Sequence, residues 1–208
     1  MKTMVPIEEK IDVYDLDELL TRFSAPMRSH SRRVAVCSSI IAEYASNFKV
    51  FYDIPSGTSL PQIAHSGGTC HDIGKLLLPA LDVKGDGYFQ HPVLGADLIE
   101  NHKAEMFGNE PSANLIVEIV RYHHEQNDGG GFPEGLKSRD IPLAAGICAI
   151  ADTLDHCMFS NSKTEADEAL IYRVLEEQAG KLYCECVWVC AERAWPRLME
   201  EYVLWKSI

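Results

Sequence analysis

A histidine and an aspartate are neighbours at positions 71 and 72, near the end of residues 60–75, a segment whose apolar spacing predicts a helix. Burying such a charge without a partner costs several kcal/mol, and a bound metal ion would remove that cost. The two side chains would lie about 100° apart around a helix, so one ion could sit over the edge between them. Alternatively, Asp72 could bridge two ions while His71 binds one. Either arrangement requires further ligands from other parts of the chain.

Lys75 and two glycines belong to the same segment. Lys75 follows His71 by four residues, which predicts a position on the same helix face, where its ammonium could hold an anionic substrate or a developing charge. Gly67 and Gly68 are unfavourable inside a helix and therefore indicate close packing against a neighbouring element.

A second stretch, HHEQNDGGGFP at residues 123–133, is named here the glycine loop. His123 and His124 end a predicted helix, and the helix dipole alone could explain a histidine pair there. That explanation does not account for Glu125, Asp128 and three consecutive glycines, which would let the backbone approach a ligand closely. The stretch therefore indicates a second group of ligands.

Three further candidates come from separate predicted helices. His30 lies in the first turns of a helix over residues 26–44, and alone it would suit a surface or core-edge position. His91 opens a helix over residues 91–105, where capping or surface exposure is an equal alternative. Asp152 follows the apolar run CAIA within a helix that begins near residue 141, so a metal ligand is favoured over a cap.

Composition restricts the function classes. A chain of 208 residues can form one domain, and we expect an arm with a short helix at residues 1–25 followed by the main domain at residues 26–208. The net charge of −12 argues against binding a nucleic-acid polymer or an anionic membrane. A phosphorylated substrate is still compatible, because bound dications set the local field.

Cysteine usage and the N-terminus favour the cytoplasm. Seven scattered cysteines, an odd number, suggest thiols in a reducing compartment, and for the cluster Cys184, Cys186 and Cys190 a structural role is favoured over a redox or metal role. The N-terminus has no secretory signal, and no apolar run approaches the ~20 residues of a membrane-spanning helix. Additional helices, but no strand, are predicted at residues 15–23, 113–124, 164–178 and 182–202, the last bent at Pro196.

The order H…HDxxK…HPxxGA…HHExxDGxGFP…ADTLD over residues 28–158 resembles the HD-GYP family of the HD superfamily of metal-dependent phosphohydrolases. The resemblance implies an all-α fold, an HD-domain helical bundle with a metal site between helices. It also implies two or three iron or manganese ions and hydrolysis of cyclic di-GMP. By the same resemblance, Asp72 and Lys75 are the expected catalytic residues. The expected metal ligands are His30, His71, Asp72, His91, His123, His124 and Asp152.

The resemblance also assigns substrate contacts. These are Lys75 and, in the signature that begins at Asp128, Gly129, Gly131, Phe132 and Pro133, with Phe132 in place of the family's tyrosine. Lys163 is the remaining basic candidate, because FSNSKTEAD replaces an arginine-rich segment of the family. Pro26 stands where some members have a glutamate ligand, so two ions are expected rather than three. The segment from Asp72 to His91 is shorter than is usual for the family, which predicts a trimmed cleft wall.

The predicted activity is hydrolysis of a phosphodiester, foremost cyclic di-GMP, by a hydroxide that bridges two metal ions. Two alternatives are an HD-type phosphohydrolase of another nucleotide or phosphoester, and a catalytically silent signalling module that binds metal. The expected ligand is a nucleotide or phosphodiester small molecule. A homodimer or a signalling partner protein is left open.

Overall fold

The computed structural model describes residues 15–45, 54, 56–79, 85–108, 111–159 and 168–207, and its regular structure is helical. A single bridge between Ala179 and Tyr183 is the only extended pairing among these residues. The all-α prediction is therefore confirmed. The α-helices are α1 (Leu16–Thr21), α2 (Ala25–Ala45), α3 (Leu60–Cys70), α4 (His91–Asn101), α5 (Lys103–Phe107), α6 (Ala113–Tyr122), α7 (Leu143–Phe159), α8 (Glu168–Glu177) and α9 (Glu185–Lys206). Short 3-10 helices are η2 (Ile73–Leu77), η3 (Asp86–Gln90) and η4 (Ser138–Asp140).

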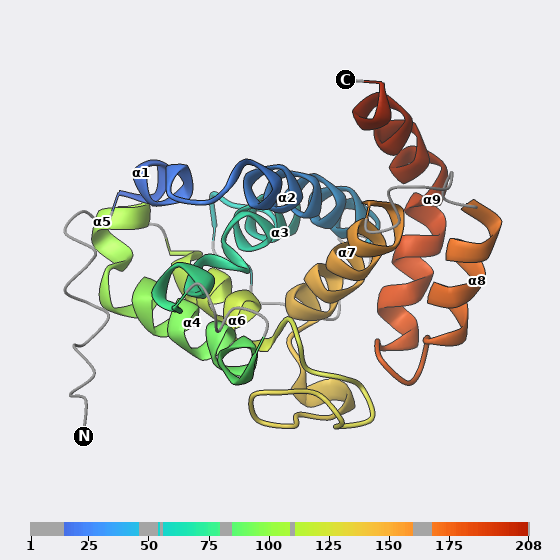
Figure 1. Cartoon of the computed structure of the whole chain (residues 1–208). Coiled ribbons are helices and arrows are strands. Elements are labelled where there is room, and N and C mark those ends of the chain that lie inside the picture. The colour runs from blue at the N-terminus through green and yellow to red at the C-terminus, as the bar shows by residue number, and fades with distance from the viewer. Residues whose placement is uncertain are drawn as a thin grey trace.

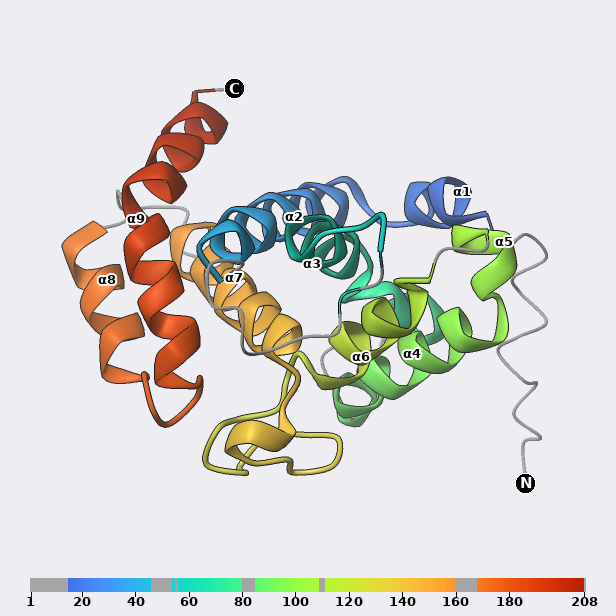
Figure 2. The same ribbon diagram turned by 180° about the vertical axis from the view of Figure 1, so that it is seen from behind.

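The helices enclose two hydrophobic clusters. The larger cluster joins α2, α3, α7 and α9, with fully buried side chains such as Ile41, Ile147 and Leu198. The smaller cluster joins α4 and α6 to η2, and Leu19 of α1 packs into it. Figures 1 and 2 show α2, α3 and α7 in the middle of the molecule, with α4 to α6 at one end and α8 and α9 at the other. The candidate ligands come from the elements where these two clusters meet.

The close packing predicted for the two glycines of α3 is confirmed. A Cβ atom at Gly67 would overlap the side chain of Ile119 in α6, and one at Gly68 would lie 2.8 Å from the Cα of Ala35 in α2. The hydroxyl of Ser59 caps the helix by accepting a hydrogen bond from Gln62 N. Because α3 is held tightly between α2 and α6, its C-terminal end is fixed next to both.

The helix predicted over residues 60–75 is shorter than expected. It ends at Cys70, and His71 and Asp72 form a turn before η2 begins. The helix predicted over residues 91–105 is divided at His102 into α4 and α5, and the helix predicted to reach residue 124 ends at Tyr122. Residues 1–14 and 164–167, included in the predicted arm and in the predicted helix 164–178, lie outside the described residues.

The cysteines only partly follow the prediction. Cys37, Cys70, Cys148 and Cys190 are buried thiols, and Cys157 is half-buried. Cys184 and Cys186 instead form a disulfide at the start of α9, which the sequence analysis did not predict.

The last helix contains Pro196 and bends partway along its length, as the sequence predicts (Figures 1 and 2). Within the described part of the chain, no helix combines the length and apolar character needed to span a membrane.

Candidate metal centre

The first group of ligands gathers side chains from three places in the chain. His30 comes from α2, His71 from the turn after α3, and Asp152 from α7. His30 Nε2 lies 3.2 Å from His71 Nε2 and 3.2 Å from Asp152 Oδ1. The packing of α2, α3 and α7 around one core therefore brings together residues that are up to 122 positions apart in sequence.

The second group consists of three histidines. His91 is the first residue of α4, and His123 and His124 directly follow α6. His91 Nε2 lies 3.3 Å from His123 Nε2, and one ring nitrogen of each residue lies within 4.8 Å of the others. The contact of α4 with α6 produces this group.

Asp72 lies between the two groups. Its Oδ1 is 3.3 Å from His91 Nε2, while its Oδ2 is 3.5 Å from His71 Nε2 and 3.8 Å from His30 Nε2. The side chain is only 3% exposed. One carboxylate therefore presents one oxygen to each group, the arrangement needed to bridge two ions. All seven predicted metal ligands lie in this cluster.

Backbone carbonyls fix the orientation of three imidazole rings. The Nδ1 atoms of His71 and His123 lie 2.7 and 2.8 Å from the carbonyl oxygens of Gly68 and Val120, and His91 Nδ1 makes the same contact with Tyr88. A carbonyl oxygen can only accept, so each Nδ1 carries the proton and donates it. The Nε2 lone pair of each ring consequently points into the cluster, as metal ligation requires.

His30 is oriented differently, by a carboxylate that the sequence analysis missed. Its Nδ1 lies 2.8 Å from Asp155 Oδ2, and Arg33 donates to both oxygens of Asp155, from Nε at 2.6 Å and from a terminal nitrogen at 2.9 Å. The sequence signal for this role was the position of Asp155, three residues after Asp152. Residues three apart in an apolar helix share a face, so a second buried acid there needs partners of its own.

The protonation states of three buried histidines and of Asp72 suit metal ligation. Burial lowers the pKa of His71 and of His123, and it lowers that of His124 to about 3, which keeps these imidazoles neutral. Burial raises the pKa of Asp72, but His71, His91 and Lys75 outweigh it and lower the pKa well below its usual value.

The pKa of Asp152 in α7 and the pKa of His30 in α2 shift in opposite directions. Burial alone would raise the pKa of Asp152, but His30 and His71 outweigh it and the pKa falls. Burial alone would lower the pKa of His30, but Asp152 and Asp155 raise it to about 9, so a metal ion bound at this imidazole would replace a proton.

Two buried atoms support the presence of cations. Asp72 Oδ1 and Asp152 Oδ1 are buried and accept no hydrogen bond. Two ligand atoms that each lie ~2.1 Å from one ion, at 90–110° to each other, are ~3.0–3.4 Å apart. The distances of 3.2 and 3.3 Å between ligand atoms in the two groups fall in this range. The residues present therefore fit divalent metal ions, and imidazole with carboxylate suits iron, manganese or zinc.

Lys75 is at the centre, but it does not share a continuous helix face with His71 as the sequence predicts. Its Nζ donates to Asp72 Oδ2 at 2.6 Å, because the chain turns after Cys70 and places the lysine against the carboxylate three residues earlier. The ammonium also lies 5.7 Å from the centre of the Tyr88 ring. A cation is thus held beside the bridging acid.

The glycine loop is held by hydrogen bonds to two other segments. The amides of Asn127 and Asp128 donate to the carbonyls of Leu182 and Lys181, each at 3.0 Å, in the turn that leads to α9. The carboxylate of Glu125, only 3% exposed, accepts the amides of Glu134 and Leu136 at 2.7 and 2.9 Å. This anchoring role of Glu125 was not evident from the sequence.

Two glycines of this loop allow close packing where a larger side chain would overlap neighbouring atoms. A Cβ atom at Gly131 would overlap the backbone of Gln126, and Gly129 has a φ of +83° and faces the side chain of Lys137. Phe132 stacks on the imidazole of His124, with ring centres 4.7 Å apart, and Pro133 follows it. The contacts that these four residues make with substrate remain a prediction.

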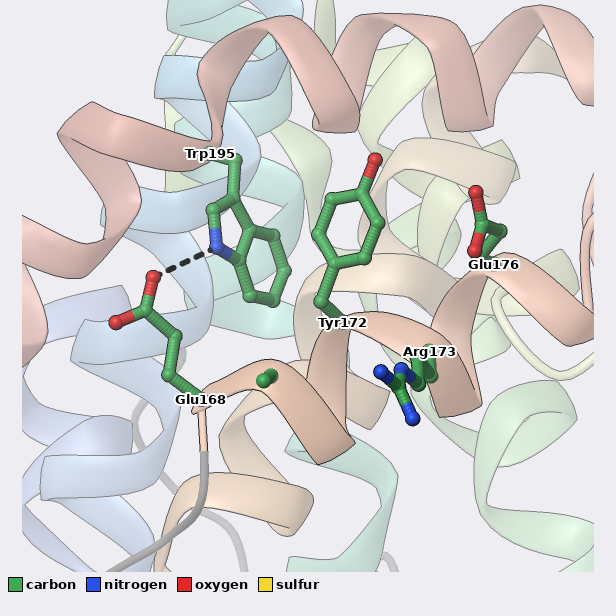
Figure 3. Close-up of a pocket in the computed structure, with 6 residues that line it drawn as sticks. Glu168, Tyr172, Arg173, Glu176 and Trp195 are labelled. Carbon is green, nitrogen blue, oxygen red and sulfur yellow. Dashed lines mark hydrogen bonds between the residues drawn. The ribbon is translucent and has the colours of Figure 1, made fainter.

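A hollow of about 570 Å³ lies elsewhere, between α8 and α9 (Figure 3). It is lined by Tyr172, Trp195 and charged side chains of α8, and none of the predicted site residues contributes to it. Lys163, the last predicted substrate contact, lies outside the described residues.

Comparison with known proteins gives consistent matches. Residues 27–156 match the family model described as HD domain. A cyclic di-GMP phosphodiesterase from Thermotoga maritima is 32% identical over 168 residues, which cover 74% of this chain and 40% of that protein. The cyclic di-GMP phosphodiesterase response regulator RpfG from Xanthomonas campestris is 30% identical over 59% of this chain and 33% of its own length. A 3'3'-cGAMP-specific phosphodiesterase from Vibrio cholerae is 25% identical over 66% of this chain and 27% of that protein.

Proposed function

The chain belongs to the HD domain family, and on that premise we propose that it is a metal-dependent phosphodiesterase that hydrolyses cyclic di-GMP. One observation carries the proposal: Asp72 directs its two oxygens to two separate groups of histidines. A mononuclear site has no need for a buried carboxylate in that position. Because the chain spans at most about 40% of the length of the relatives described above, the activity of those whole proteins is proposed here and not transferred.

HD domain phosphohydrolases bind divalent metals, and the His/Asp groups described above could hold them. Two ions, manganese or iron, are proposed. His30, His71, Asp72 and Asp152 would hold the first, and Asp72, His91, His123 and His124 would hold the second. Once bound, two such ions lower the pKa of a shared water and neutralise charge on a phosphodiester.

The protein's own residues would arrange the reaction around these ions. Asp72 would contribute one oxygen to each group, and Lys75, held at 2.6 Å from it, would supply an ammonium to stabilise negative charge on phosphoryl oxygens. The pKa values of Asp72 and Asp152 are both lowered. Both carboxylates therefore stay ionised, and the centre keeps their two negative charges.

Substrate recognition is proposed for the aromatic edge of the centre. Phe132 lies against His124, and Phe89, which is 58% exposed, meets the Phe132 ring at a centre distance of 5.0 Å. Exposed rings beside a phosphate site can stack on a purine base. Lys75, Gly129, Gly131, Phe132, Pro133 and Lys163 remain the proposed substrate contacts. Several relatives are named cyclic di-GMP phosphodiesterases, which supports a purine cyclic dinucleotide as substrate.

A second candidate substrate is 3'3'-cGAMP, since two relatives are named as specific for it. A silent metal-binding module is less favoured because the ligand set is complete. A cytoplasmic location and a homodimer or signalling partner are also retained as proposals.

The test uses purified protein loaded with manganese or iron and offered each cyclic dinucleotide, with products separated by chromatography. The proposal expects phosphorylated guanosine products from cyclic di-GMP and their loss, together with metal, in Asp72→Ala. Asp97→Ala, which removes an exposed carboxylate paired with Arg121, is the matched control and should keep both. Turnover of 3'3'-cGAMP alone would select the second candidate. Metal binding without turnover of either would favour the silent module.

A further inference from the structure

His156 is not among the predicted site residues, yet its side chain lies next to the metal centre. It follows Asp152 by four residues in α7, so both side chains leave the same helix face. Its Nε2 lies 3.3 Å from Asp152 Oδ1, and its ring centre lies 4.9 Å from that of His30. The side chain is 59% exposed, whereas those of Asp152 and His30 are 11% and 12% exposed. His156 therefore stands at the solvent side of the first group.

The Asp152 oxygen that lies between His30 and His156 has an imidazole nitrogen on either side. Asp152 Oδ1 is buried, and no contact to it has hydrogen-bond geometry, although His30 Nε2 and His156 Nε2 lie only 3.2 and 3.3 Å from it. A cation shared by the three atoms would satisfy this oxygen. Both distances fall within the ~3.0–3.4 Å expected for neighbouring ligands of one ion.

An ordinary ion pair explains the arrangement less well. An exposed histidine–carboxylate pair contributes little to stability, and such a pair would involve only the two residues of α7. In this structure the three ligand atoms of His30, Asp152 and His156 all lie within 4.8 Å of one another, although His30 comes from a different helix. The convergence of two helices on one oxygen is what a shared ion requires.

We propose that His156 is an additional metal ligand, which binds the ion at His30 and Asp152 from the solvent side. His30 has one ring nitrogen available, because its Nδ1 is bonded to Asp155, so it can bind a single ion. His156 therefore adds a neutral imidazole to that ion and tightens its binding. The inference rests on the metal centre of the proposed function, and it does not depend on which substrate is hydrolysed.

The experiment is a Mn²⁺ titration of the metal-free full chain, followed by electron paramagnetic resonance and by competition with a chelator. Wild type, His156→Ala and the control His65→Ala, which removes an exposed histidine of α3 outside the metal groups, are compared. We expect a roughly 10–100-fold weaker affinity for one Mn²⁺ in His156→Ala, and unchanged affinity for the other. His65→Ala should bind as wild type does.

Several results would overturn the inference. Unchanged Mn²⁺ number and affinity in His156→Ala would do so, and a raised KM with unchanged Mn²⁺ binding would assign the residue to substrate. Thermal unfolding of the metal-free variants checks that the exposed substitution leaves the fold intact. Failure of cyclic di-GMP hydrolysis in wild type would refute the proposed substrate, while the Mn²⁺ titration would still answer the question about His156.

Discussion

Replacing Asp155 with alanine should destabilise the fold, because this residue is the partner of a largely buried cation. Asp155 is 2% exposed and binds both nitrogens that Arg33 presents, and Tyr202 of α9 lies 3.5 Å from its Oδ1. Removing one partner of a buried ion pair costs about 3–5 kcal/mol, since the other charge remains without compensation. Arg33 is 16% exposed and lies over the Phe159 ring, so we expect a loss near the lower end, about 3 kcal/mol.

The assays are urea denaturation and thermal unfolding of the metal-free protein, both monitored by far-ultraviolet circular dichroism. For a chain of this size, about 3 kcal/mol corresponds to a fall in Tm of about 6–12 °C. Asp97→Ala is the matched control, because Asp97 also pairs with an arginine but is 55% exposed, and such pairs contribute at most about 1 kcal/mol. Equal losses in the two variants would refute the reasoning that burial decides the cost.

The same substitution should weaken metal binding through His30. Without Asp155, the Nδ1 of His30 loses the acceptor that fixes its ring, and loss of such a contact typically costs 10–100-fold in metal affinity. Asp155→Asn keeps a carbonyl acceptor for the ring and removes only the charge, so its affinity should fall between those of wild type and Asp155→Ala. If Asp155→Ala binds Mn²⁺ as tightly as wild type, the orienting role is wrong.

Three further outcomes follow from the same structure. Ile119→Ala removes a fully buried side chain that packs on Gly67 and should cost about 2–5 kcal/mol in urea denaturation, whereas Leu204→Ala at a 57% exposed position should cost under about 0.5 kcal/mol. Glu125→Ala leaves the amides of Glu134 and Leu136 without their acceptor and should cost about 2–3 kcal/mol while speeding protease cleavage of the glycine loop; unchanged cleavage would contradict this anchoring. With free Mn²⁺ held at 100 times its dissociation constant, removing the metal with a chelator should lower stability by about 2.7 kcal/mol for each bound ion in wild type and leave Asp72→Ala unaffected, which calorimetry would measure.

The clustering of the candidate metal ligands was predictable because it depends on residue types. Histidines and aspartates in apolar helices need partners, and Asp152 after CAIA pointed inward in the sequence as it does in the structure. The apolar spacing also located α2, α6 and α9 within a few residues. Helix positions and inward-facing side chains can be predicted from such local patterns, because the apolar face that is buried determines both.

Contacts made across helices were not predictable. Asp155 and His156 stood next to a predicted ligand, but their roles depend on His30 and Arg33, which lie more than 120 residues earlier and reach them only after α2 packs on α7. The anchoring of Nδ1 atoms by backbone carbonyls depends likewise on where each helix ends. The disulfide of Cys184 and Cys186 depends on the turn before α9.

The early end of α3 explains how one aspartate can serve two groups. In a continuous helix the His71 and Asp72 side chains would diverge by about 100° and both would stay near α3. Instead Asp72 has φ and ψ of −97° and 5°, outside the helical region, and η2 turns toward α4. Gly74 then packs so tightly beneath His91 that any side chain there would overlap its backbone carbonyl. The break in the helix thus brings α4 against the turn. Because the backbones of Gly74 and His91 touch, the His91 side chain comes within 3.3 Å of Asp72 Oδ1.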